Sequence, residues 1–328
     1  MTAWADYYAT HIYPGVSAAL SWLASPFRWS LTEIEVVAIL VLAVGLIVRA
    51  VVKRRRWWRC LLAELGLALF VVAWFYGAWG INYFRSSLYD RLESVPMPYE
   101  EAEFHEFLEA FADNLNASWC EVESVDPAEV ESSIKAWYAE LPSECGLCQP
   151  RSWQHPKYLI FNRLYSAVGV LGFIGPAFDE MHVNQDVSPL EYPFIFAHEY
   201  AHVLSVSNEA EANFWAFEAC RASEDPAIRY SAWYMLLSFT ARNIRSLLGE
   251  EAYQTWADTL IPEVYVDLEL AQLHWQELRW PWLSKFQHKF YNLFLRTNRI
   301  PEGTANYGQV LRLVLTFSDL HLHDGEEE

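Results

Sequence analysis

Residues 191–217 read EYPFIFAHEYAHVLSVSNEAEANFWAF, and this stretch decides how the chain is interpreted. Pro193 suits the first turn of a helix, so a helix is expected to run through the HEYAH motif. On that helix His198 and His202 share one face, where two imidazoles can bind one metal ion. Glu199 can then act as general base on a water molecule that zinc makes acidic near neutral pH. An HExxH string also arises by chance, so the surrounding residues have to support the site.

A catalytic zinc site needs a third protein ligand, and Glu209 and Glu211 both follow the motif closely. On an unbroken helix Glu209 would lie about 10 Å beyond His202, too far to share the ion. Residues 205–208, Ser-Val-Ser-Asn, favour a turn that folds a second helix back over the first. Glu209 and Asn213 share a face of that second helix, whereas Glu211 points elsewhere. We therefore predict Glu209, rather than Glu211, as the third ligand, and Asn213 as a hydrogen-bonding partner of a ligand histidine.

Two apolar stretches lie near the N-terminus, at residues 31–52 and 60–81. Each is long enough to cross a hydrocarbon core of about 30 Å. The sequence between them, KRRRWWR at residues 53–59, is typical of a short cytoplasmic loop with tryptophans at the interface. We therefore predict a transmembrane hairpin over residues 31–81 in the cell membrane, with everything else outside the cytoplasm. The alternative is a pair of buried core helices.

The hairpin divides the rest of the chain into residues 1–30 and residues 82–328. The first part has no basic segment followed by a cleavage site, so it is not a standard signal peptide. Its apolar segment at residues 16–23 is too short to span a bilayer and is predicted as an interfacial helix that ends near Pro26. Residues 82–328 are predicted to form one extracytoplasmic domain that leaves the membrane through a linker at residues 96–98.

The predicted domain is mainly α-helical with a small β hairpin. Helical periodicity is present at residues 100–116 and 128–141, and the chain looks helical from Pro193 almost to its end. Residues 157–162 and 166–184 differ, because glycines and alternating apolar residues there predict short strands or an extended hairpin. The first periodic segment places four apolar residues on one face: Phe104, Phe107, Leu108 and Phe111.

Composition supports membrane contact and disfavours nucleic acid as a partner. Hydrophobic residues make up 53% of the 328 residues, and 16 are tryptophan, which is rich for a soluble protein. The formal charge of −19 opposes binding to phosphates. The lone CxxC at residues 145–148 lacks the context of a zinc ribbon or a thioredoxin-like motif. Disulfides are possible in an oxidising compartment, and free thiols fit equally well, at Cys120, Cys145, Cys148 and Cys220.

The arrangement resembles the glutamate-ligand zincins, in which HExxH is followed by a helix that carries ExxxD, with Asn213 here in place of the aspartate. A closer resemblance is to a bacterial family of two-span membrane proteins with an extracytoplasmic HExxH zinc-peptidase domain, numbered 3810 among the domains of unknown function. Ser205 departs from the glycine that relatives commonly carry after the second histidine. The resemblance rests on GFIGPAFDEMHVN at residues 172–184, EYPFIFAHEYAH at 191–202, EAEANFWAFEAC at 209–220, and C-terminal segments at 291–298 and 303–308.

The resemblance implies two further elements of the site. In zincins an extended edge strand beside the metal pairs with the substrate backbone. Residues 166–174 are the candidate here, at Ala167, Val168, Gly169 and Val170; a structural hairpin without substrate contact is the alternative. An oxyanion donor is also expected. Tyr230 is the candidate, although a packed core tyrosine fits as well.

These features together predict a membrane-anchored zinc metallopeptidase that contacts the lipid bilayer and a peptide or protein substrate. In this reading zinc, held by His198, His202 and Glu209, polarises the scissile carbonyl, and Glu199 moves a proton from water to the leaving amine. The main alternative is a non-catalytic zinc-containing membrane receptor or scaffold that binds peptides, against which the intact Glu199 argues. A soluble helical protein with a fortuitous HExxH is the third possibility.

Overall fold

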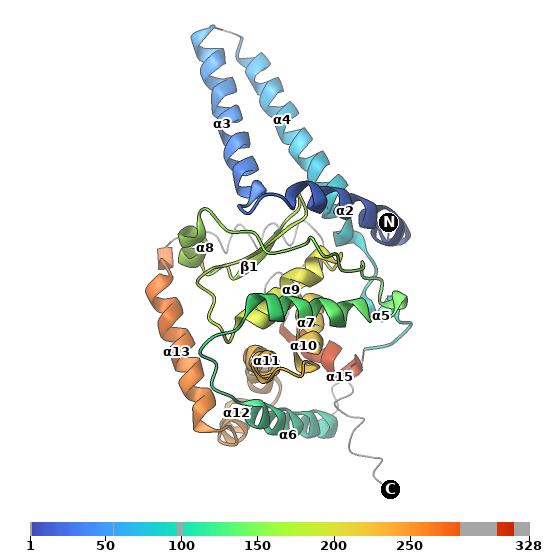
Figure 1. The fold of residues 1–328 in the computed structure, drawn as a ribbon, viewed down its shortest axis with the longest axis vertical. Coiled ribbons are helices and arrows are strands. Elements are labelled where there is room, and N and C mark those ends of the chain that lie inside the picture. Colours follow the sequence, from blue (N-terminus) through green and yellow to red (C-terminus); the bar gives the residue numbers. More distant parts are fainter. Residues whose placement is uncertain (1, 55, 97–100, 283–306, 318–328) are drawn as a thin grey trace.

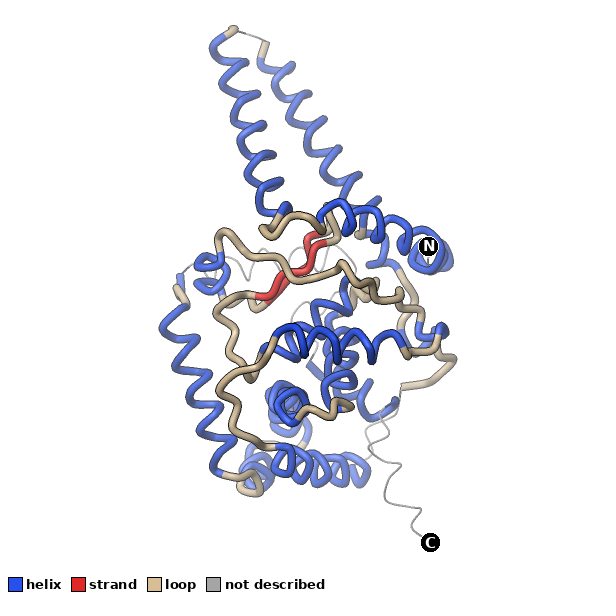
Figure 2. The backbone as a smooth tube through the Cα atoms, in the orientation of Figure 1, coloured by secondary structure: helices blue, strands red, loops and turns tan. Residues whose placement is uncertain are grey.

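The computed structural model describes residues 2–54, 56–96, 101–282 and 307–317, which form a mainly helical protein with one two-stranded antiparallel sheet (Figures 1 and 2). This confirms the predicted combination of helices with a small β hairpin. Residues 97–98 of the linker predicted at 96–98, the signature segment at 291–298 and residues 303–306 of the segment at 303–308 lie outside the described residues. The helical elements are α1 (Thr2–Tyr7), η1 (Tyr8–Ile12), α2 (Tyr13–Ala24), α3 (Leu31–Val52), α4 (Trp57–Ala78), η2 (Gly80–Phe84), α5 (Leu88–Arg91), α6 (Glu101–Ser118), α7 (Pro127–Ala139), η3 (Ser143–Cys145), α8 (Asn162–Val168), α9 (Tyr192–Val203), α10 (Glu209–Arg221), α11 (Pro226–Leu247), α12 (Glu250–Ala257), α13 (Pro262–Leu278) and α15 (Tyr307–Phe317).

Helices α3 and α4 project together from one end of the domain (Figure 1). Each has 22 residues and an apolar stretch with no part buried inside the protein, so both are long and apolar enough to cross a membrane. Helix α3 coincides with the span predicted at residues 31–52. Helix α4 begins and ends three residues earlier than the span predicted at 60–81.

The second span ends early because Trp79 leaves the helical conformation, with φ −152°. Its indole Nε1 donates to the carbonyl oxygen of His202 at 3.0 Å, and its side chain is buried. The chain then continues as the short 3₁₀ helix η2. The prediction that the span extends to Ile81 was therefore wrong: residues 79–81 belong to the domain that carries the HEYAH motif.

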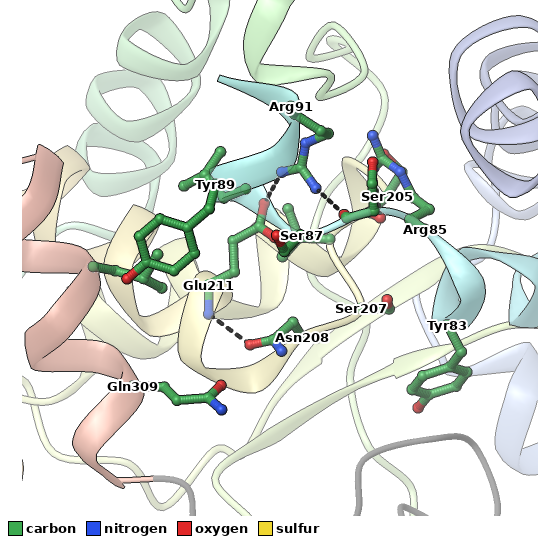
Figure 3. Close-up of a pocket in the computed structure, with 14 residues that line it drawn as sticks. Tyr83, Arg85, Ser87, Tyr89, Arg91, Ser205, Ser207, Asn208, Glu211 and Gln309 are labelled. Carbon is green, nitrogen blue, oxygen red and sulfur yellow. Dashed lines mark hydrogen bonds and ion pairs between the residues drawn. The ribbon is translucent and has the colours of Figure 1, made fainter. Parts of the chain in front are cut away.

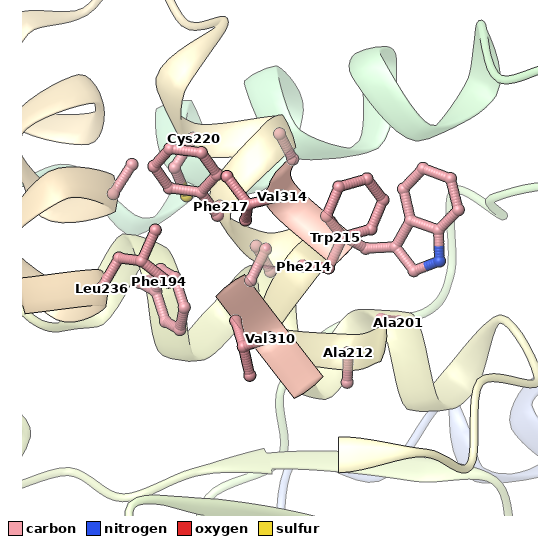
Figure 4. Close-up of a cluster of buried hydrophobic side chains, with 14 of the residues drawn as sticks. Phe194, Ala201, Ala212, Phe214, Trp215, Phe217, Cys220, Leu236, Val310 and Val314 are labelled. Carbon is pink, nitrogen blue, oxygen red and sulfur yellow. The ribbon is translucent and has the colours of Figure 1, made fainter. Parts of the chain in front are cut away.

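The core of the domain lies where α9, α10, α11 and α15 meet (Figure 4). Helices α6 and α7 cover it with the apolar faces expected from their periodicity. Phe104, Phe107 and Phe111 are each at most 2% exposed, and Ile134 of α7 is fully buried. Burial of aromatic side chains on this scale is the main stabilising term for such a core. The HEYAH helix is thus surrounded by packed helices and held rigidly.

The segment between residues 157 and 184 differs from its predicted form. Residues 162–168 form α8, which ends at Gly169 with φ 76°, a left-handed conformation that favours glycine. The Ser166 hydroxyl on this helix lies 2.6 Å from Asp186 Oδ2 and 3.1 Å from the Asn162 carbonyl oxygen. The hairpin follows, with β1 (Gly172–Gly175) antiparallel to β2 (Glu180–Val183). The prediction of an edge strand at Ala167, Val168, Gly169 and Val170 was therefore wrong, although a hairpin is present just beyond it.

The N-terminal helix α2 packs on the domain through one side and exposes apolar residues on the other. Tyr13 is completely buried, and its hydroxyl lies 2.8 Å from the Oδ1 of Asp179. Ser17 Oγ lies 2.5 Å from the other carboxylate oxygen. The opposite side of α2 keeps Trp22 63% exposed. The predicted interfacial helix thus has one face fixed to the hairpin turn that contains Asp179.

The buried Asp179 carboxyl makes stability depend on pH. Burial raises the pKa of Asp179 from 3.8 to about 7, although hydrogen bonds from Ser17 and Tyr13 lower it. Because the folded pKa lies above the unfolded one, the contribution of Asp179 to stability is most favourable below about pH 4 and falls as the pH rises toward 7. We expect Asp179→Asn to raise the thermal midpoint at pH 8, with the difference shrinking toward pH 5. Unfolding in detergent at both pH values tests this, and parallel pH profiles of the two proteins would contradict it.

All five cysteines lie in the described part of the chain and are free. Cys145 and Cys148 are buried, and burial raises the pKa of both thiols. Among the described residues no pair therefore forms one of the disulfides that the sequence left open.

Candidate metal centre

The predicted turn between α9 and α10 is present and has a defined geometry. Val206 N donates to the Ala201 carbonyl at 3.0 Å, and Ser205 N donates to the His202 carbonyl at 3.1 Å. These two bonds form a Schellman motif, in which the residue after the helix cap takes a left-handed conformation. Ser205 occupies that position with φ 82°. The chain therefore reverses directly after the second histidine, and α10 packs back against α9.

A side-chain hydrogen bond stabilises Ser205 in its left-handed backbone conformation. Its Oγ accepts from Arg85 Nη1 at 2.7 Å. We expect Ser205→Val to lower the free energy of unfolding by about 2–4 kcal/mol, because a β-branched residue is strained there and the bond is lost. Ser205→Gly relieves strain but also loses the bond, so its effect should stay within about 1 kcal/mol. Denaturant unfolding in detergent compares the two; equal losses would contradict the backbone argument.

The turn brings three potential metal ligands together. His198 Nε2 and His202 Nε2 are 3.2 Å apart. The Oε2 of Glu209 lies 3.3 Å from the first and 3.7 Å from the second. A tetrahedral zinc ion with ligand distances of about 2.0–2.1 Å separates neighbouring ligand atoms by about 3.3 Å. The spacing of these three atoms therefore fits one zinc ion.

The hydrogen bond made by Nδ1 of each imidazole determines whether Nε2, which faces the other ligands, can bind a metal. His198 Nδ1 is 3.0 Å from Asn213 Oδ1, and His202 Nδ1 is 2.7 Å from the Val206 carbonyl oxygen. Both partners are acceptors, so each Nδ1 carries a proton, and each imidazole presents a lone pair at Nε2 whenever it is neutral. Two lone pairs and a carboxylate oxygen then converge on one point, and they repel one another unless a cation or a proton lies between them. This donor set is the one that zinc prefers.

The electrostatics of the group agree with a site that attracts positive charge. Burial lowers the pKa of His202, but hydrogen bonding and attraction from Glu209 outweigh it and raise that pKa to about 9. Burial acts to raise the pKa of Glu209, yet the two histidines hold it well below its usual range. The Glu209 side chain remains 35% exposed, so the group is reachable from outside.

Glu199 stands beside the three ligands with an unsatisfied oxygen. It is 5% exposed, and its Oε2 is buried without a hydrogen-bond partner among the described residues. Burial raises its pKa, although the two histidines lower it. Gly172 of β1 leaves room for it, because a Cβ at that position would lie 2.6 Å from Glu199 Oε1. A buried carboxylate without a partner is costly, which indicates a functional role rather than a structural one.

Glu211, the rejected alternative, points away from the histidines. Its Oε1 forms an ion pair with Arg91 and accepts from Trp215 Nε1 at 3.0 Å. Figure 3 shows this pair in a pocket that residues 205–208 of the turn help to line, where Asn208 Oδ1 caps α10 by accepting from the backbone N of Glu211. The structure therefore gathers Glu209 and Asn213 at the histidines and separates Glu211 from them.

Two predicted site residues lie elsewhere, and two neighbours of the site were missed. Tyr230 donates to Asp267 Oδ2 at 2.6 Å in a separate pocket, so it is a packed tyrosine and not part of the group around His198. Ala167, Val168, Gly169 and Val170 lie before β1, as described above. Trp79 was missed because it sat inside the predicted span. Gly172 lies inside the candidate stretch 166–174 but was not singled out, since its only signal was a glycine in an apolar run.

Comparison with known families gives one match. The family described as "Protein of unknown function (DUF3810)" matches residues 8–315, which is most of the chain and includes the hairpin, the turn and the candidate metal centre. No curated protein matches the chain. No solved structure matches it.

Proposed function

The chain belongs to the DUF3810 family of proteins of unknown function, and from that premise we propose that it is a membrane-anchored zinc metallopeptidase. The observation that carries the proposal is the convergence of two imidazole nitrogens and a carboxylate oxygen beside buried Glu199, whose Oε2 has no hydrogen-bond partner among the described residues. This combination provides both a metal site with protein ligands on one side and a base next to it. A peptide-binding receptor would need neither the base nor its enclosure.

The proposed ligands are His198 Nε2, His202 Nε2 and Glu209 Oε2. Asn213 and the Val206 carbonyl keep the two imidazoles in the tautomer that binds metal, and they fix the direction of each lone pair. Zinc bound there would act as a Lewis acid toward a carbonyl oxygen and would lower the pKa of water. With three protein ligands, a fourth position stays open for water or substrate.

Glu199 serves as the general base and acid. Its carboxylate takes a proton from the attacking water and then delivers it to the amine that leaves. Burial, which raises its pKa, favours the protonated form that has to exist between these two steps. Its unpaired Oε2 is available for the water, because no protein donor competes for that oxygen among the described residues.

Strand β1 is the proposed binding edge for the substrate backbone; it overlaps the end of the candidate stretch 166–174 and replaces the positions at residues 167–170. Asn184 N donates to the Leu171 carbonyl at 2.8 Å, so the alternation of an antiparallel ladder turns the backbone groups of Gly172 and Ile174 away from β2. No other strand pairs with this edge in the part of the chain that the structure describes. A peptide that adds to it would pass Gly172 and therefore Glu199.

The two apolar helices are the proposed membrane anchor. The loop between them contains five basic residues and two tryptophans within residues 53–59, which favours the cytoplasmic side. Both helices then enter the domain from the opposite side of the bilayer. In this topology the candidate metal centre lies on the extracytoplasmic side of the cell membrane.

Cleavage of synthetic peptides tests this function. The full-length protein in detergent is incubated with a mixture of peptides of varied sequence, and products are identified by mass spectrometry. We expect cleavage that stops when 1,10-phenanthroline removes the metal and returns when Zn²⁺ is added. Peptide binding by zinc-loaded protein without any cleavage would instead support the receptor or scaffold named as the alternative.

A further inference from the structure

The first membrane helix is fixed to the β hairpin beside the candidate metal centre. The Glu180 carboxylate accepts from Thr32 N and from Thr32 Oγ1, both at 2.8 Å, and so caps the start of α3. His182 Nε2 lies 2.8 Å from Ser30 Oγ, which in turn accepts from Glu33 N at 3.0 Å. Both Glu180 and His182 are buried in β2. The anchor is therefore an extension of the hairpin rather than a flexible tether.

The turn of the hairpin lies between the bases of the two membrane helices. At Gly175, the last residue of β1, an added Cβ would lie 2.1 Å from Thr32 Oγ1. The Ala177 carbonyl in the turn accepts from Trp74 Nε1 of α4 at 3.3 Å. Figure 1 shows the sheet directly beneath the point where both helices leave the domain. One end of β1 is thus at the membrane side of the molecule.

The opposite end of β1 is at the candidate metal centre, where Gly172 contacts Glu199. Three residue steps of about 3.3 Å separate Gly172 from Gly175 by about 10 Å. Ile34, the first residue of α3 with an exposed large apolar side chain, lies two residues beyond Thr32, which is about 3 Å along the helix axis and within one turn of about 5 Å. The distance from Glu199 to the hydrophobic boundary is therefore about 13–15 Å.

The face of the domain around the base of α3 is itself apolar. Large hydrophobic side chains are exposed there on α2, on the following loop, on the segment before α8 and on α8: Trp22, Phe27, Trp29, Tyr158, Phe161 and Leu164. Aromatic residues of this kind are typical of the membrane–water interface, and a cluster of exposed apolar residues beside a membrane helix fits contact with lipid. This face brings the bilayer close to α8, which directly precedes β1.

We propose that the substrates are membrane-anchored polypeptides, cut in the extended stem that leaves the bilayer. This inference rests on the proposed peptidase function and adds the class of substrate. A stem that rises from the membrane beside α3 meets the free edge of β1 at Ile174, next to Gly175, and reaches Glu199 at Gly172. At about 3.3 Å per residue, about 13–15 Å corresponds to about four to six residues between the bilayer and the cleaved bond. The rigid attachment of α3 to β2 sets this distance.

A reporter with a randomised stem tests the proposal. The full-length protein is reconstituted into liposomes with a single-span reporter that carries a randomised stem of about 24 residues, and cut positions are read by mass spectrometry. Sharing one membrane raises the local concentration of every stem position, so the distribution of cuts, not the total rate, is decisive. We expect cuts about four to six residues from the span to exceed those beyond about 15 residues by at least about tenfold. The same stems without a span should show no such maximum.

A lengthened anchor provides the matched variant. Four polar residues inserted between Glu35 and Val36 of α3, and four between Phe70 and Val71 of α4, raise the domain by about 6 Å. The maximum should then move outward by about two residues. A flat distribution of Glu199-dependent cuts, or an unmoved maximum in the lengthened protein, would overturn the proposal and leave the peptidase intact. If the zinc-loaded protein cuts neither the anchored nor the free stems, the peptidase function is refuted instead.

Discussion

Replacing Glu199 with glutamine is expected to slow peptide hydrolysis by about 10²–10⁴-fold while the protein keeps its zinc. Glutamine has nearly the same shape, so it fits the space beside Gly172, but it cannot accept the proton of the attacking water. The three proposed ligands are left untouched, and the imidazoles keep their partners Asn213 and Val206. A large loss of rate with unchanged zinc content would therefore assign the base.

The measurement compares initial rates on one peptide for the wild type, Glu199→Gln and Glu218→Gln. Glu218 is a suitable control, because it makes the same chemical change on α10, where its carboxylate pairs with Arg221 at 2.6 Å. That variant should retain activity within a few-fold. Hydrolysis by Glu199→Gln at the wild-type rate would contradict the proposed role of this carboxylate.

Removing the Glu209 carboxylate is expected to weaken zinc binding strongly, which is the second largest effect that we predict. Loss of residues that only orient a ligand histidine typically weakens metal binding by 10–100-fold. Glu209→Ala removes a proposed ligand itself, so we expect a loss of more than about 100-fold. Asn213→Ala should fall within the 10–100-fold range, because it only frees the His198 ring.

Glu211→Gln is the matched control for this series. Its side chain contacts Arg91 and Trp215 on the other face of α10, so zinc affinity should stay near the wild-type value even if stability falls. Zinc affinity is measured by competition with a chromogenic chelator, after circular dichroism has verified that each variant is folded. Weaker binding in Glu211→Gln than in Glu209→Ala would reverse the assignment of the third ligand.

The local part of the site was predictable because it follows from helical geometry. Four-residue spacing places His198 and His202 on one face, and the turn residues after them require a reversal of the chain. Once the chain reverses, the spacing of Glu209 and Asn213 selects them over Glu211. The left-handed conformation at Ser205 follows from the same turn, because the residue after a helix cap in a Schellman motif adopts it.

The less predictable parts depend on contacts between residues far apart in the chain. The end of α4 is set by the bond from Trp79 to His202, 123 residues away, and no local pattern marks it. The packing of Tyr230 depends on Asp267 in another helix. Residues 166–170 have apolar residues and glycine that suit a strand, but residues 166–168 belong to α8, which ends at Gly169 in a left-handed conformation. Docking of α2 through Asp179 likewise lies beyond local periodicity.

The zinc content of the purified full-length protein tests the central claim most directly. The wild-type protein and a His198→Ala, His202→Ala double variant are dialysed against a slight excess of Zn²⁺ and then freed of unbound metal. Their zinc content is measured by inductively coupled plasma mass spectrometry. We predict about one zinc per wild-type chain and close to none in the double variant. Wild-type protein that holds no zinc, or a double variant that holds as much as the wild type, would contradict a metal centre at His198, His202 and Glu209.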